Sequence, residues 1–120
     1  MKMKLIRMGL LIFLLWGVIF SPHFLRAQTA GSAVRGKLYY DGHCASCHGL
    51  SGDGNGPAGA SMTPPPTNFK NSAVMSALAD NDIQRAILVG KENTAMRGFG
   101  TVLQPQDVQD LVAYVRSFSP

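Results

Sequence analysis

The two cysteines of this 120-residue chain stand three positions apart, and a histidine directly follows the second, in the run Cys44-Ala45-Ser46-Cys47-His48. A disulfide across so short a loop would hold little of the chain together. A single domain of this length buries a modest fraction of its surface and often needs a further staple. We therefore expect something other than a disulfide to organise the core around these residues.

The spacing of Cys44, Cys47 and His48 is the attachment motif of a covalently bound haem. Two thiols on one turn can reach the two vinyl-derived carbons of a haem, and the histidine that follows can direct its imidazole at the iron. The apolar faces of a haem would supply the core that a small domain lacks. We expect one haem c per chain, attached through both cysteines, with His48 as an axial ligand of the iron.

Two other interpretations of these residues, and a calcium loop in the segment that follows them, are weaker. A structural zinc module needs four ligands, and beyond the motif only His43 is a donor of comparable strength within residues 28–120. A thioredoxin-like pair needs alternating strands and helices around it, and the flanks here favour helix and loop. A calcium loop beginning at Asp53 would need ligands where the chain has Pro57 and Pro64.

The first 27 residues have the order of an export signal. Three basic residues precede an apolar run of about a dozen residues, and small residues follow. We expect a signal peptide over residues 1–27 and one haem-binding domain over residues 28–120, with cleavage after Ala30 or Ala33 as alternatives. An uncleaved membrane anchor also stays open, although the run is shorter than the roughly 20 residues that span a bilayer.

The basic charge of the chain comes from this leader. Four of the eleven lysines and arginines lie in residues 1–27, which leaves seven basic against seven acidic residues in the rest. A near-neutral domain does not attract polyanions over long distances. We therefore expect redox proteins as partners and no nucleic acid.

An ordered set of segments resembles the class I monohaem cytochromes c over essentially all of residues 28–120. These segments are residues 36–40, 44–49, 52–57, 64–66, 95–100 and 111–115. The resemblance implies an all-α fold in which three to four helices wrap around the haem, with a long glycine- and proline-rich loop.

Local patterns agree with an all-α fold. Residues 49–70 contain five glycines and four prolines, so regular structure is not expected there. Asp80 predicts the start of a helix that ends at Gly90, and Pro105 suits the first turn of another. The stripe of the last helix has the spacing i, i+3, i+4, i+7 and consists of Val108, Leu111, Val112 and Val115.

A shorter stripe predicts the first helix. Val34, Leu38 and Tyr40 or Asp41 form a short helical stripe that leads into the attachment motif. Gly36 interrupts the stripe. Because glycine in a helix costs about 1 kcal/mol relative to alanine, it usually has a packing reason. We expect Gly36 to let the first helix cross the last one closely.

The second axial ligand is expected to be Met96, which lies between the two later helices where Gly98 and Gly100 free the backbone. Met62 and Met75 are the alternatives, and most such methionines fill cores. The resemblance also points to Met96, although Arg97 stands where the family usually has proline. The resemblance further implies that Pro57 contributes a backbone carbonyl to the His48 ring.

Iron held by imidazole and thioether has no open position and a raised potential. We expect a periplasmic one-electron carrier, or the haem subunit of a larger oxidoreductase, and not an enzyme in itself. Its donor and acceptor would be redox proteins, including a membrane-bound respiratory complex or a dehydrogenase. The alternative is a haem enzyme or gas-binding sensor with a displaceable distal ligand, and only Arg97 favours it.

Overall fold

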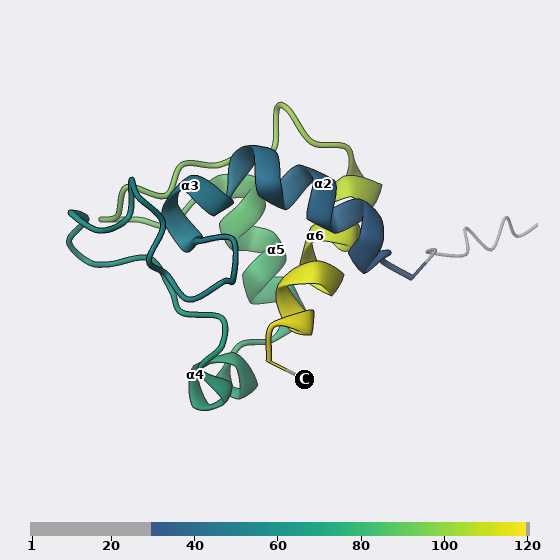
Figure 1. Cartoon of the computed structure of the whole chain (residues 1–120). Helices are drawn as coiled ribbons and strands as arrows, with labels where there is room; N and C mark the ends of the chain where they lie inside the picture. The colour runs from purple at the N-terminus through teal and green to yellow at the C-terminus, as the bar shows by residue number, and fades with distance from the viewer. Residues whose placement is uncertain (1–29, 120) are drawn as a thin grey trace, which may run out of the picture.

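The computed structural model describes residues 30–119, so the expected signal peptide over residues 1–27 lies outside the described part (Figure 1). Five helices follow one another, and among the described residues no strand is present, only one isolated bridge between Gly90 and Arg97. The helices are α2 (Ala33–His43), α3 (Ala45–His48), α4 (Ser72–Ala77), α5 (Asp80–Val89) and α6 (Pro105–Ser117). The predicted all-α fold is confirmed.

Helix α2 lies across α6 (Figure 1), and Gly36 of α2 lies directly against the backbone of α6. A Cβ atom at Gly36 would lie 2.0 Å from the carbonyl oxygen of Asp110 and 2.9 Å from Cβ of Tyr114. Only glycine fits such a backbone contact. The predicted close crossing is confirmed.

The apolar stripe expected for α2 is buried only at Tyr40. Val34 and Leu38 are exposed to 80% and 73%, while the buried residues of α2 are Gly36 and Tyr40. Helix α2 meets α6 through Gly36, through Tyr40 and through a polar contact, and not through these aliphatic side chains. That contact centres on Asp110, whose side chain is 1% exposed.

Asp110 accepts hydrogen bonds from three residues, two of them at the start of α2. The Ser32 N–H and the Arg35 Nε donate to its two oxygens at 2.7 Å each, and Gln106 Nε2 donates at 3.1 Å. Burial raises the pKa of this carboxyl, but these hydrogen bonds and the charge of Arg35 outweigh burial and hold the pKa below its usual value. The carboxylate thus ties the start of α2 to the middle of α6.

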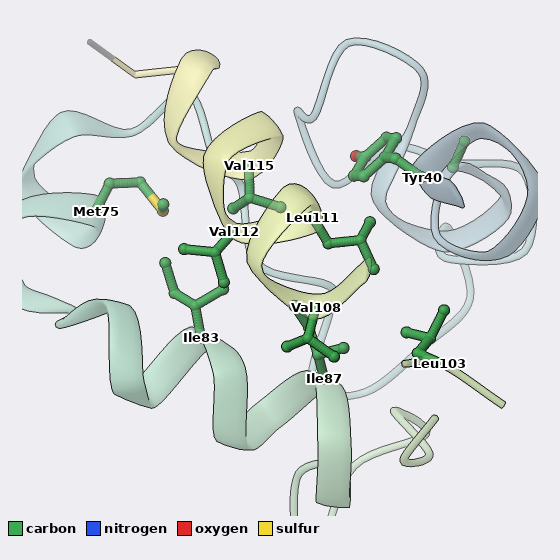
Figure 2. Packing of buried hydrophobic residues seen from close by; sticks show 10 residues of the cluster. Tyr40, Met75, Ile83, Ile87, Leu103, Val108, Leu111, Val112 and Val115 are labelled. Carbon is green, nitrogen blue, oxygen red and sulfur yellow. The ribbon is translucent and has the colours of Figure 1, made fainter. Parts of the chain in front are cut away.

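The hydrophobic core lies between α5 and α6 (Figure 2). The predicted stripe of α6 is buried in full, and Ile83 and Ile87 of α5 point toward it. Met75 of α4 is 2% exposed and belongs to the same core, as expected for a methionine that fills space. Fully burying one such side chain stabilises a fold by about 1.5–3 kcal/mol.

The ends of the two later helices follow their sequence signals. Helix α5 begins at Asp80, where the Asp82 carboxylate accepts the Ala79 N–H at 3.1 Å, and Gly90 ends it with φ of 88°. Helix α6 begins at Pro105, which needs no N–H partner at that position. Within residues 30–119, no helix combines the length and the apolar character needed to cross a bilayer.

Candidate functional site

Cys44 lies at the junction of α2 and α3, and Cys47 lies one turn further on, within α3. The Cys44 N–H donates to the Tyr40 carbonyl at 2.9 Å and ends α2, and the Cys44 carbonyl then accepts the N–H groups of Cys47 at 3.1 Å and His48 at 2.9 Å. Both thiols are free and half-buried. Burial, with the neighbouring Cys47, raises the pKa of the Cys44 thiol to about 11. This turn presents two thiols and an imidazole together, as the motif predicts.

The ring of His48 is held from two sides. Its Nδ1 lies 3.2 Å from the carbonyl oxygen of Thr67, and the ring of Phe69 stacks on it at 4.5 Å with an interplanar angle of 16°. A carbonyl only accepts, so Nδ1 carries the hydrogen and Nε2 keeps a free lone pair. Burial lowers the pKa of His48 more than the Thr67 carbonyl raises it, which favours the neutral ring. A neutral imidazole with a free Nε2 is the form that binds a metal.

The role expected for Pro57 belongs to Thr67 instead. The N–H groups of Gly54, Gly56 and Ala58 donate to the carbonyls of His48, Cys47 and Ser46 at 2.8, 3.1 and 2.9 Å. Along this stretch the backbone therefore presents donors to α3, and Pro57 itself is exposed. The chain reaches the His48 ring only after the three prolines at 64–66, where Thr67 supplies the carbonyl.

A cluster of aromatic side chains packs beside the site, in contact with Phe69. The ring centroids of Phe118 and Phe69 lie 6.3 Å apart. The ring centroid of Tyr40 lies 5.1 Å from that of Tyr114 and 5.3 Å from that of Phe118. The Tyr40 hydroxyl donates to the Gly49 carbonyl at 2.8 Å. Tyr40 of α2 thus reaches the residue after the motif and packs against two aromatic residues at the end of α6. Sequence reasoning missed Thr67, Phe69 and Phe118.

The predicted second ligand lies on a separate loop, called here the Met96 loop (residues 91–98), which follows α5. Met96 is half-buried. Just after the loop, the ring of Phe99 lies 6.0 Å from that of His43, and Arg97 lies 5.4 Å above the Phe99 ring. Since His43 directly precedes Cys44, this contact places the end of the Met96 loop beside the attachment turn.

The other methionines occupy different surroundings. Met75 is in the core described above, and Met62 is half-buried in the proline-rich loop. In residues 30–119, no group of three or more His, Cys, Asp and Glu side chains is placed to hold a metal ion.

A family model described as cytochrome c matches residues 33–119. The chain belongs to the cytochrome c family. Cytochrome c-554(547) of Halothiobacillus neapolitanus is 34% identical over 89 residues, which make up 72% of this chain and 96% of that protein. The resemblance to class I monohaem cytochromes c is thereby confirmed.

Three similar solved structures differ in how much of their own length matches this cytochrome. The KustC0563 c-type cytochrome has a TM-score of 0.61 at 28% identity, over 71% of this chain and 98% of its own. A chain of the Kuenenia stuttgartiensis reducing HAO-like protein complex Kustc0457/Kustc0458 has a TM-score of 0.60 at 32% identity, over 71% of this chain but 41% of its own. Dihydro-heme d1 dehydrogenase NirN in complex with DHE has a TM-score of 0.56 at 31% identity, over 72% and 16%.

The residues present fit the cofactor that the family carries. The attachment turn offers two thiols that form no disulfide, and the imidazole next to them has Nδ1 hydrogen-bonded to a carbonyl and Nε2 left for a metal. This cytochrome is therefore an electron-transfer protein with covalently bound haem c.

Proposed function

We propose that this chain carries one haem, attached through Cys44 and Cys47, with His48 Nε2 and the Met96 sulfur as axial ligands of the iron. The observation that supports this most is the His48 ring, which directly follows Cys47 and has Nδ1 committed to the Thr67 carbonyl. That contact leaves Nε2 as the nitrogen available to iron. The bound haem would supply one-electron chemistry at a potential raised by the thioether ligand.

The residues around the site would keep it rigid. Thr67 fixes the tautomer of His48, and the flat contact with Phe69 limits rotation of its ring. A ligand that cannot turn changes little when an electron arrives, which favours fast transfer of single electrons, and Met96 as the second ligand would leave no open position for small molecules. This is why we favour an electron carrier over a gas-binding sensor.

We further propose that residues 1–27 direct export to the periplasm and that residues 28–120 act there as a free carrier. A free carrier is supported by the length of two similar proteins, because the match to this chain spans 96% of cytochrome c-554(547) and 98% of the KustC0563 c-type cytochrome. The similar regions of the larger structures make up 41% and 16% of their chains. A role as a subunit of a membrane-bound respiratory complex or a dehydrogenase is the alternative.

Docking to redox partners would depend little on charge. In the described part of the chain, four ion pairs involve Arg35, Lys37, Arg85 and Arg116. The cations outside these pairs are Lys70, Lys91 and Arg97, and the last two belong to the Met96 loop. We propose that partners meet an apolar surface beside this loop, with Arg97 as its main charged contact.

Haem staining after denaturing electrophoresis tests the attachment. The wild-type protein should keep its haem through denaturation, and the Cys44→Ser/Cys47→Ser double variant should lose it. A redox titration of the wild type should fit a single one-electron step, and the reduced protein should not bind carbon monoxide. Full haem in the double variant, or rapid uptake of carbon monoxide, would contradict the proposal.

A further inference from the structure

The Met96 loop is held by hydrogen bonds and contains no proline. Its two arms pair as a short antiparallel bridge between Gly90 and Arg97, in which the Lys91 N–H donates to the Met96 carbonyl at 3.0 Å. Past the loop, the N–H groups of Phe99 and Gly100 donate to the last carbonyls of α5, at 2.8 and 3.0 Å. Both arms are therefore fixed to the end of one helix.

One side chain joins the two arms inside the loop. The Thr94 hydroxyl donates to the Lys91 carbonyl at 2.7 Å and accepts the Met96 N–H at 3.2 Å. The Thr94 N–H also donates to the Lys91 carbonyl at 3.3 Å, which closes a turn with Asn93 at φ of 56°. A positive φ at this place in a turn is well tolerated by asparagine. Thr94 is thus hydrogen-bonded directly to the backbone of Met96.

We propose that Thr94 is a positioning residue that holds the Met96 sulfur on the iron, through its hydroxyl bridge between the Lys91 carbonyl and the Met96 N–H. This inference rests on the proposed role of Met96 as axial ligand. In a loop without proline, the backbone angles at residues 94–96 are restrained by these hydrogen bonds. Their loss increases the fraction of molecules in which Met96 has left the iron.

An external ligand measures that open fraction. Imidazole binds ferric iron only when Met96 has moved away, so its apparent affinity scales with the population of the open state. Removing the hydroxyl should raise imidazole affinity about tenfold, which corresponds to one net hydrogen bond. The Met96 amide should also exchange its hydrogen about tenfold faster in the holoprotein, because its acceptor is gone.

The variants are Thr94→Val, which keeps the branched shape, and Thr94→Ala as a second change that removes the hydroxyl. Thr94→Ser restores the hydroxyl and should return imidazole affinity and amide exchange to near wild type. Thr101→Val is the matched control, because Thr101 is an exposed threonine just beyond the loop. It should bind imidazole like the wild type.

Three results would overturn the inference. Thr94→Val with lower stability but wild-type imidazole affinity would show a purely structural role and leave the role of Met96 intact. Thr94→Ser with the same increased affinity as Thr94→Val would show that the methyl group and not the hydroxyl matters. A ferric protein with bound methionine has a far-red sulfur–iron charge-transfer band. Retention of this band in Met96→Ala would overturn the proposed function and this inference together.

Discussion

Replacing Gly36 by alanine tests the helix crossing on which the fold around the site depends. The new Cβ would lie 2.0 Å from the Asp110 carbonyl oxygen and 2.9 Å from Cβ of Tyr114. Atoms in favourable contact lie about 3.5–4 Å apart, and a backbone carbonyl cannot rotate away as a side chain could. Helix α2 must therefore move away from α6, and the hydrogen bond from Ser32 to Asp110 must lengthen.

The magnitude follows from three contributions. Adding a methyl group to a packed interface typically costs about 1–3 kcal/mol, and a clash with backbone belongs at the upper end. Weakening one hydrogen bond adds about 1 kcal/mol. Alanine recovers about 1 kcal/mol because it is the better helix former. The net loss of unfolding free energy is then about 2–3 kcal/mol, or about 30- to 150-fold in the unfolding equilibrium.

Gly42 provides the matched control on the same helix. A Cβ there would meet nothing within 4 Å, so Gly42→Ala should keep only the gain in helix propensity, up to about 1 kcal/mol. Guanidinium unfolding of the holoproteins, followed by far-ultraviolet circular dichroism, measures both effects. Relative to wild type, the unfolding midpoint should fall in Gly36→Ala and rise in Gly42→Ala. Equal stabilisation by both substitutions would refute the close crossing.

Three further outcomes are expected. Since the folded-state pKa of Asp110 lies below the usual carboxyl value, its stabilisation is complete above about pH 4 and is lost as the pH falls through the folded-state pKa. Asp110→Asn should lower the free energy of unfolding by about 2 kcal/mol at pH 7. This is the value of one hydrogen bond to a charged group, because water screens the half-exposed Arg35. The curves of stability against pH for variant and wild type should converge in acid. Phe69→Leu should lower unfolding stability by about 1–2 kcal/mol through loss of the stack on His48, which denaturant titration measures; no loss would argue against the stack. Electron-transfer rates with the physiological partner should change only a few-fold across a salt series in stopped-flow experiments, and a hundredfold drop would reveal a charged docking face.

Features set by local signals could be predicted from the sequence. The start and end of α5, the proline at the start of α6 and the buried stripe of α6 each depend on residues close together in the chain. Gly36 could be interpreted because a glycine inside a helix has few explanations other than close packing. The attachment turn is likewise a local pattern of five residues.

Features set by contacts between distant residues could not be predicted. The exposure of Val34 and Leu38 follows from the contact of Ser32 and Arg35 with Asp110, more than seventy positions away. A buried carboxylate leaves no periodic pattern in the sequence of α2. Apolar spacing alone therefore favoured the wrong face of this helix.

The partner of His48 was missed for a similar reason. Every residue except the last has a backbone carbonyl to offer, so the sequence does not distinguish Thr67 from Pro57. The choice depends on the path of residues 49–70, which have no regular structure. Phe69 also gave no signal, because a single aromatic residue after a proline run has no periodicity to place it.

The ligation of the iron is tested most directly by the far-red absorption of the ferric protein, where a sulfur–iron charge-transfer band reports a bound methionine. The wild type should show this band. Met96→Ala should lose it, show a lower potential and admit carbon monoxide to the reduced iron, while Met62→Ala, a change at another half-buried loop methionine, should keep the band. A band that survives in Met96→Ala and disappears in Met62→Ala would contradict the assignment of Met96 as the ligand opposite His48.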